Sequence, residues 1–315
     1  MNLTFLKTGD AILNYHKIRP DKYLTKHNDE LAVSVSKFKE QLTFLKRNYN
    51  LVSLEDFLNF KKSNKNNISI TFDDGYKDNL KYALPILNEL NVPATIYLVT
   101  KFFENEFSVW WYELYDFIWK NSKNIEFEYG EKKYDISIKN NLEKLKCFKK
   151  LREVIKKLNK TEQEKFLSAL TKTNFRKQYK DEFLSKEDLE LLNKNKLITI
   201  GAHTHNHLSL KNLEEKDCIK EISKSKEILE QLTNRRINHF SYPYGTKNDV
   251  GKREFKIVKE LGFKSAVTTS VGKISEEKLF NLPRIHINEK TNERNLKIKL
   301  SIFYYFYKKF QGHVI

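Results

Sequence analysis

Two short stretches of the chain concentrate side chains that are able to do chemistry. "ISITFDDG" ends in two adjacent carboxylates, Asp73 and Asp74, and "GAHTHNHL" places His203, His205 and His207 within five residues. Adjacent carboxylates repel each other, and burial of such a pair raises one pKa, so the pair favours a nearby cation. Neutral imidazole is the commonest metal ligand in proteins. Together the two stretches predict a metal site.

His203 and His207 share a face in both local geometries that this stretch allows, and in a strand His205 shares that face too. Alternate residues of a strand share a face, and so do positions i and i+4 of a helical turn, so either geometry brings these two rings together. Two histidines and one carboxylate form a recognised ligand set that leaves positions open for water and substrate. One of Asp73 and Asp74 supplies that carboxylate, and the other stays free to act as a base. The charge of the metal offsets the repulsion between the two acids.

A third stretch, "FSYPYG" at Phe240–Gly245, predicts a tight turn at the end of a strand. Pro243 fixes the local backbone and Gly245 permits the turn. Such a turn is able to aim a backbone N–H into a site. The alternative is an ordinary turn at a strand end with aromatic side chains in the core.

The elements that must position these stretches alternate between strands and helices. Short apolar runs predict strands, and amphipathic segments between them predict helices, one of which, "YKDNLKYALPILNEL", contains Pro85 as a site for a kink. The order predicts parallel βαβ units. From about 103 to 184 the pattern breaks: an aromatic segment is followed by a charged segment that we expect to be helical, and we interpret the whole as an insertion. The apolar runs are "AILNYHKI", "ISITF", "ATIYLV", "LITIGA", "INHFSY" and "KSAVTT".

In their order along the chain, "TFDDG", "HTHNH" and "YPYG" resemble the first three motifs of the polysaccharide deacetylases, carbohydrate esterase family 4, which share the NodB homology domain. The resemblance covers Ala11 to about Ile287. It implies an α/β fold, a distorted (β/α) barrel, here with a helical insertion. We therefore expect a catalytic domain at 1–287, with the insertion at about 103–184, and a basic aromatic C-terminal tail at 288–315.

The resemblance also implies an activity, the metal-dependent removal of N-acetyl groups from a sugar. It implies one divalent metal ion, with zinc expected, and Asp73 as the general base. The ligands it implies are Asp74, His203 and His207, while His205 falls at a variable position of the motif. The backbone N–H of Tyr244 is expected to stabilise the oxyanion.

The chain departs from the family pattern at two places. The third motif usually begins with an arginine that orients the catalytic aspartate, and Ser241 stands there instead. Arg284, in "LPRIHI", is the candidate that replaces this arginine beside Asp73, and a surface salt bridge is the alternative.

The second departure concerns the general acid, because the family's late Leu-x-His motif is not clear in this sequence. We favour His16 in "LNYHKI", which ends the first predicted strand, where the sites of barrel enzymes gather. It resembles the "YH" opening of family members with a circularly permuted motif order. His286 is the second candidate, and a structural role is the alternative for both histidines.

Composition indicates the surroundings of the protein. The net charge of +17 favours an anionic ligand or membrane face, but it is spread along the chain without a nucleic-acid-binding signature, which argues against nucleic acid as a partner. Two cysteines without a paired motif, and an N-terminus without the apolar run of a signal peptide, predict a cytoplasmic protein. The stretch 296–310 is aromatic and basic, and one interpretation is peripheral contact with the inner membrane face. The alternative is a terminal helix packed on the barrel.

The expected substrate is an N-acetylated sugar or glycan, and for a cytoplasmic enzyme a lipid-linked or nucleotide-linked precursor. Three other interpretations of the sequence stay open. One is a metal phosphoesterase, although the extra ligands for a second metal are not evident. Another is a non-catalytic glycan-binding or membrane-associated protein of the same fold, and the last is a basic nucleic-acid binder.

Overall fold

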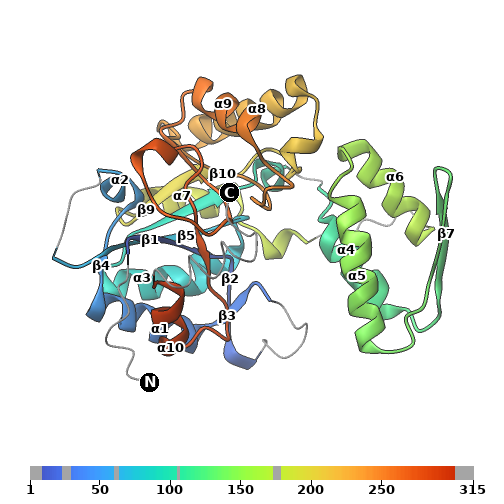
Figure 1. Ribbon diagram of the computed structural model, residues 1–315, viewed down its shortest axis with the longest axis horizontal. Coiled ribbons are helices and arrows are strands. Elements are labelled where there is room, and N and C mark those ends of the chain that lie inside the picture. Colours follow the sequence, from blue (N-terminus) through green and yellow to red (C-terminus); the bar gives the residue numbers. More distant parts are fainter. Residues whose placement is uncertain (1–8, 23–29, 60–63, 105–106, 173–178, 302–315) are drawn as a thin grey trace.

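A curled sheet of parallel strands forms the centre of the molecule in the computed structural model, which describes residues 9–22, 30–59, 64–104, 107–172 and 179–301 (Figure 1). Its strands are β1 (Ala11–Tyr15), β4 (Asn50–Leu51), β5 (Asn67–Phe72), β6 (Ala94–Leu98), β9 (Ile198–Ala202), β10 (His239–Ser241), β11 (Ser265–Val267) and β12 (Ile285–His286). The order across the sheet is β11-β10-β9-β6-β5-β1-β12, and β4 pairs with β5. The central strands β1, β5 and β6 are buried throughout, as expected for parallel strands covered on both faces. The expected α/β fold with a distorted barrel is confirmed.

Helices cover the sheet on both sides, with α8 and α9 above it and α1 and α3 below it in Figure 1. Helix α1 shows why: Phe38, Leu42 and Leu45 recur at helical spacing and are fully buried in the main core, while Ser34 caps the first turn. A small parallel pair, β2 (Lys17–Arg19) and β3 (Ala32–Ser34), precedes α1. The helices of the barrel are α1 (Val35–Asn48), α2 (Leu54–Phe57), α3 (Leu84–Leu90), α7 (Lys186–Lys194), α8 (Glu215–Thr233), α9 (Lys252–Glu260) and α10 (Glu293–Lys299).

The helix that contains Pro85 is irregular on the N-terminal side of the proline. A π-helical turn, η3 (Asn79–Ala83), precedes α3, and Pro85 lies in the first turn of α3. Proline has no N–H to donate to the carbonyl four residues before it, so the preceding turn widens. Short 3₁₀ segments occur elsewhere in the described ranges: η4 (Thr100–Phe103), η5 (Lys180–Glu182), η6 (Leu210–Asn212) and η7 (Glu276–Lys278).

The segment 282–286 links the two edges of the sheet. Leu282 bridges Val267 of β11 in parallel, and β12 pairs with β1 through Leu13 and Ile285. Arg284 lies between these two contacts. Its backbone N–H donates to the carbonyl oxygen of Ser270. This one segment therefore completes the distorted barrel and places Arg284 at its mouth.

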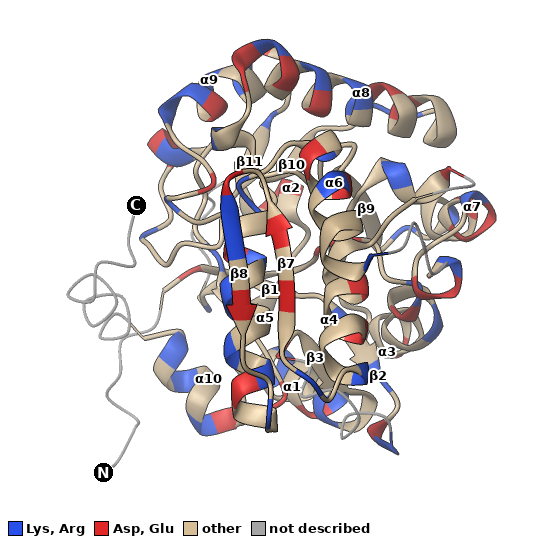
Figure 2. Ribbon diagram, turned by 90° about the vertical axis from the view of Figure 1, so that its right-hand side faces the viewer, with Lys and Arg blue, Asp and Glu red and all other residues tan. Residues whose placement is uncertain are grey.

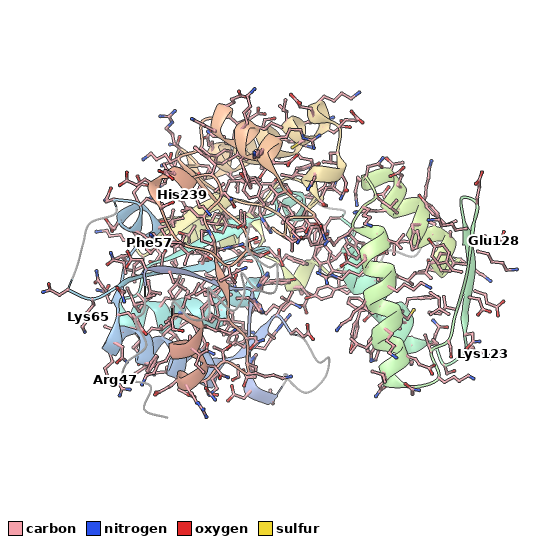
Figure 3. All side chains as sticks on the ribbon, in the orientation of Figure 1. Arg47, Phe57, Lys65, Lys123, Glu128 and His239 are labelled. Carbon is pink, nitrogen blue, oxygen red and sulfur yellow. The ribbon has the colours of Figure 1, made fainter. Side chains whose placement is uncertain are left out.

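The insertion lies to one side of the barrel and has a hydrophobic core of its own. In the view of Figure 2 its strands lie in front of its helices, and in Figure 3 Lys123 and Glu128 mark its outer edge, far from Arg47 on the barrel. Its elements are α4 (Trp110–Lys120), β7 (Ile125–Tyr129), β8 (Lys132–Ile136), α5 (Asn141–Ile155) and α6 (Lys160–Thr171).

The expectation that the insertion is helical after its aromatic segment is wrong at 125–136. These residues form an antiparallel hairpin, β7 and β8, joined through Gly130 with φ +58°. Buried Ile125 and Phe127 alternate with exposed Glu126 and Glu128, which is the period of a strand with one covered face. Across the hairpin Glu128 faces Lys133. Opposite charges at such positions stabilise the pair.

The described part of the C-terminal tail packs on the barrel. Leu296 of α10 and Leu300, just after that helix, are buried in the main core. The membrane contact considered at 296–310 falls mostly on 302–315, which lie outside the described residues. Within the described ranges, no helix combines the length and the apolar character that a membrane span requires.

Candidate metal centre and active site

The two adjacent carboxylates come directly after buried strand β5 and point to different partners. Asp74 has φ 73° and Gly75 has φ 74°, so the chain turns sharply in the left-handed region immediately after Asp73. A Cβ at Gly75 would lie 2.8 Å from Cδ2 of Leu98. The turn sends the side chain of Asp73 towards Arg284 and that of Asp74 towards the histidines of the loop after β9.

Asp74, His203 and His207 form one buried group. Oδ1 of Asp74 lies 3.3 Å from Nε2 of His203 and 3.3 Å from Nε2 of His207. Each residue offers one ligand atom, and the three atoms lie within 4.8 Å of one another. The structure therefore brings together the three residues that the sequence predicts as metal ligands.

The loop after β9 positions the histidines, and it is neither strand nor helix. His203 continues the line of β9, whereas Thr204 and His207 both have positive φ, 64° and 57°. The N–H of His207 donates to Oγ1 of Thr204 over 3.0 Å, which closes the loop. His205 points elsewhere, with Nδ1 2.9 Å from Oγ1 of Thr100 and Nε2 3.3 Å from the carboxylate of Glu104. Its exclusion from the ligand set fits this arrangement.

The hydrogen bonds of His203 show that the site suits a cation. Nδ1–H of His203 donates to the carbonyl oxygen of Ser241 over 2.7 Å, so Nε2 presents its lone pair to Asp74. Two acceptor atoms facing each other in a buried place repel unless a proton or a metal ion lies between them. Two imidazoles and one carboxylate are also the donor set that zinc accepts.

The charged groups around the two histidines favour one positive charge, on His203 and not on both rings. Burial lowers the pKa of His203, but the carboxylates of Asp73 and Asp74 outweigh burial and raise it. Burial lowers the pKa of His207, and His203 repels a second proton. Burial raises the pKa of Asp74, but its hydrogen bonds to the two histidines bring it well below its usual range. The carboxylate is therefore ionised and ready to bind a cation.

Asp73 is held by Arg284. Nη1 of Arg284 donates to Oδ1 of Asp73 over 2.8 Å, and Nη2 donates to Oδ2 over 2.6 Å. Nη2 also donates to Oγ of Ser241 over 2.9 Å. Ser241, which stands in place of the motif's arginine, thus accepts a hydrogen bond from the arginine just before β12. Burial raises the pKa of Asp73, but Arg284 and His203 outweigh it and lower the pKa to about 2. Arg284 is 1% exposed, so this pair is not a surface salt bridge.

His16 interacts electrostatically with both acids, and His286 packs against His16. Their rings are 5.7 Å apart, edge to face. Burial lowers the pKa of His16, and both Asp73 and Asp74 act on it in the opposite direction. Burial lowers the pKa of His286 to about 3, and the charges that act on it come from His16, Lys299 and Arg284 instead. Of the two candidates for the general acid, His16 is the one whose pKa responds to both carboxylates.

Tyr244 occupies the centre of a three-residue turn. The N–H of Gly245 donates to the carbonyl oxygen of Pro243 over 2.6 Å, and Tyr244 has φ 61°. Such a turn is strained for a residue with a side chain. In the part of the chain that the structure describes, the N–H of Tyr244 has no hydrogen-bond acceptor. The centroid of the Tyr244 ring lies 4.8 Å from that of His207, so the turn packs against the group of Asp74, His203 and His207.

Comparison with known families decides the identity of the fold. The family described as polysaccharide deacetylase matches residues 60–266, which is more than half of the chain and includes all three motifs. The chain belongs to the polysaccharide deacetylase family. The resemblance that the motifs indicate is therefore confirmed.

Individual members of the polysaccharide deacetylase family resemble the chain over different lengths. A poly-β-1,6-N-acetyl-D-glucosamine N-deacetylase of Staphylococcus aureus is 30% identical over 111 residues, which are 31% of this chain and 38% of that protein. Its Staphylococcus epidermidis counterpart is 28% identical over the same lengths. The chain thus aligns with well under half of these curated relatives.

Solved structures of deacetylases share the fold over nearly the whole chain. Streptococcus pyogenes deacetylase PplD, in complex with acetate, superposes with a TM-score of 0.62 and 20% identity, covering 94% of this chain and 99% of that one. IcaB from Ammonifex degensii gives a TM-score of 0.58 and 14% identity, covering 93% and 97%. At these identities the likeness establishes the fold alone.

Two residues of this deacetylase site were not predicted from the sequence. Asn14 donates from Nδ2 to Oδ2 of Asp73 over 3.2 Å. The one sequence signal for this contact is that Asn14 is a polar residue within the buried strand β1. Trp111 lies in the insertion, outside all three motifs, and its ring is 5.1 Å from that of His207. No local pattern in the sequence marks that contact.

Proposed function

We propose that this polysaccharide deacetylase removes N-acetyl groups from an N-acetylated glycan, with one divalent ion held by Asp74, His203 and His207. One observation carries the proposal: Asp73, buried and ionised, lies beside this ligand group and is held in place by Arg284. The ion, for which we propose zinc, supplies Lewis-acid activation of water and of the amide carbonyl.

The residues around the ligand group carry out the proton transfers and stabilise the oxyanion. Asp73 accepts a proton from the attacking water, whose oxygen adds to the amide carbon. The N–H of Tyr244 donates to the oxyanion that forms. His16 gives a proton to the amine as the C–N bond breaks. The products are acetate and a free amino sugar.

A polymer of N-acetylglucosamine is the first substrate to test. The support is the Staphylococcus aureus relative, which is named for the N-deacetylation of poly-β-1,6-N-acetyl-D-glucosamine. A lipid-linked or nucleotide-linked precursor is the second substrate in the proposal, because the net charge of +17 favours an anionic ligand.

We also propose that the protein works in the cytoplasm. Cys147 and Cys218 are both buried free thiols, which suits a reducing compartment. Cell fractionation with a tagged chain tests this proposal. Recovery in a fraction outside the cytoplasm and the inner membrane face would overturn it.

The central experiment measures acetate release from β-1,6-linked N-acetylglucosamine oligomers. Wild type and Asp73→Asn are stripped of metal and reloaded with zinc. We expect zinc-dependent acetate release from wild type, and loss of that release in Asp73→Asn while zinc still binds. Zinc binding without acetate from any N-acetylated sugar would contradict the deacetylase activity but not the metal site.

A metal phosphoesterase with two ions is less well supported. Among the residues that the structure describes, Asp74, His203 and His207 form the one cluster with metal-ligand geometry. Two-metal phosphoesterases hold their ions about 3.5–4 Å apart with further ligands. The same zinc-loaded protein, assayed with a phosphate ester, separates the two activities.

A further inference from the structure

His207 is enclosed by aromatic rings from two different parts of the molecule. The ring of Tyr244, from the loop after β10, lies 4.8 Å away, and the ring of Trp111, from α4 of the insertion, lies 5.1 Å away. Within the described residues, Nδ1 of His207 is buried and has no hydrogen-bond partner. Metal-binding histidines usually fix their ring through that second nitrogen, as His203 does with Ser241. Packing must therefore fix the ring of His207.

The insertion also contacts the surroundings of His207 through Lys156, which lies against Tyr244 and Asp249. Nζ of Lys156 lies 4.7 Å from the ring centroid of Tyr244 and 3.1 Å from Oδ1 of Asp249. Lys156 is 7% exposed and Asp249 is 2% exposed. A buried ion pair with these geometries fixes the side chains that it joins, because an unpaired buried charge is costly.

Asp249 links Lys156 to both loops of the site. Oγ of Ser209 donates to its Oδ1 over 3.0 Å, and Oγ1 of Thr246 donates to its Oδ2. Ser209 follows His207 by two positions, and Thr246 follows Tyr244 by two. The ion pair therefore joins the C-terminal end of α5, in the insertion, to the loop that carries the metal ligand and to the loop that carries the oxyanion donor.

We propose that the insertion contributes to the metal centre. Its residues Trp111 and Lys156 are positioning residues that hold His207 in its ligand orientation. The inference rests on the proposed function to the extent that it requires a metal at Asp74, His203 and His207. Trp111 packs against the imidazole ring directly. Lys156 acts on the same ring through Tyr244 and Asp249. Neither residue touches the reacting atoms.

The test measures zinc affinity by competition with a chelator, together with the absorption bands of the cobalt-loaded protein, which report the geometry of the ligands. We expect Trp111→Ala and Lys156→Met to weaken zinc binding by about tenfold to a hundredfold, the effect typical of lost outer-shell partners. Both should also shift the cobalt bands. Trp111→Phe keeps an aromatic ring and Lys156→Arg keeps the charge, so both should restore near wild-type values.

Matched controls come from the same two helices. Trp119→Ala removes a tryptophan from α4, and Lys150→Met removes an exposed charge from α5, and neither should change zinc affinity. Wild-type affinity and an unchanged cobalt spectrum in both Trp111→Ala and Lys156→Met would overturn the inference. If circular dichroism shows that either variant is unfolded, Trp111→Leu and Asp249→Asn take their places.

The outcome separates this inference from the proposed activity. A wild-type protein that binds zinc but releases no acetate overturns the activity, while the zinc and cobalt measurements still decide the role of the insertion. A wild-type protein that binds no zinc overturns both.

Discussion

Arg284 and Asp73 lie 211 positions apart in the chain and share two hydrogen bonds, of 2.8 and 2.6 Å, with both side chains buried. Ser241 accepts a further hydrogen bond from the same guanidinium group. The orientation of Asp73, the proposed general base, is thus determined by the segment that closes the barrel. The family's usual position for this arginine is on the earlier strand.

Removing Arg284 should destabilise the fold as well as the site. Arg284→Met leaves Asp73 buried without its counter-charge, which we expect to lower the free energy of unfolding by about 3–5 kcal/mol. Urea unfolding measures this loss. The double variant Arg284→Met with Asp73→Asn removes both charges and should recover part of it. Equal stability of the single and double variants would contradict a buried ion pair.

Zinc affinity should distinguish two histidines of one motif. His207→Ala removes a ligand, so we expect a large loss of zinc affinity in a chelator competition. His205→Ala is the matched control, because that ring bonds Thr100 and Glu104 instead of facing Asp74. A similar loss in both variants would show that the loop, and not the ligand atom, determines zinc binding.

His16 and His286 should differ in their effect on turnover. His16→Ala removes the histidine that interacts with both acids, so kcat should fall by about a hundredfold or more, as expected for a general acid. His286→Ala should leave kcat much closer to wild type. Both assays use zinc-saturated protein. A greater loss in His286→Ala would assign the proton donation to His286.

Gly245 should tolerate no side chain. It has φ +63°, and a Cβ there would lie 2.6 Å from the backbone nitrogen of Thr269. Gly130 is the matched control, because it has φ +58° and a Cβ there would meet no atom within 4 Å. Backbone strain of about 1–2 kcal/mol affects both alanine variants, and overpacking adds about 1–3 kcal/mol at Gly245. Thermal unfolding with a smaller loss in Gly245→Ala than in Gly130→Ala would contradict this prediction.

The stability of the protein should depend on pH through Asp78. Burial raises the pKa of this carboxyl to about 7, although Arg19, with Nε 3.3 Å from Oδ2, opposes the shift. Between the ordinary pKa and about 7, the folded state holds a proton that the unfolded state has lost, so stability falls as pH rises through this window. Asp78→Asn removes the effect, and Arg19 keeps its contact with Glu182.

Thermal unfolding at about pH 5 and about pH 8, on either side of the raised pKa, tests this sign. The melting temperature of Asp78→Asn relative to wild type should be higher at the alkaline pH than at the acidic one. The same difference at both pH values would contradict a raised pKa at Asp78.

The order of strands and helices in the barrel, and the ligand group, follow from local signals in the sequence. Apolar runs end at Asp73 and His203. Because parallel strands place their carboxyl ends at one edge of the sheet, these residues are predicted to lie close together although they are far apart in the sequence. The resemblance of three motifs adds the roles. The fold and the family are confirmed, and the roles of the individual residues stay predictions.

Other parts of the site depend on tertiary contacts that no local pattern encodes. Trp111 and Lys156 belong to the insertion, whose place against the loops of His207 and Tyr244 follows from packing and from one buried ion pair. The hairpin at 125–136 did leave a signal, since apolar and charged residues alternate around Gly130. Its high charge directed the prediction towards helix.

The closure of the barrel by 282–286 has a consequence for the order of events during synthesis. A ribosome makes the motifs of Asp73 and His203 well before it makes Arg284, and domains fold as their residues emerge. Until the closing segment arrives, Asp73 has no arginine to neutralise it in the interior. A nascent chain therefore carries the proposed metal ligands before Asp73 is oriented, and we expect the proposed hydrolysis only after the last strand is in place.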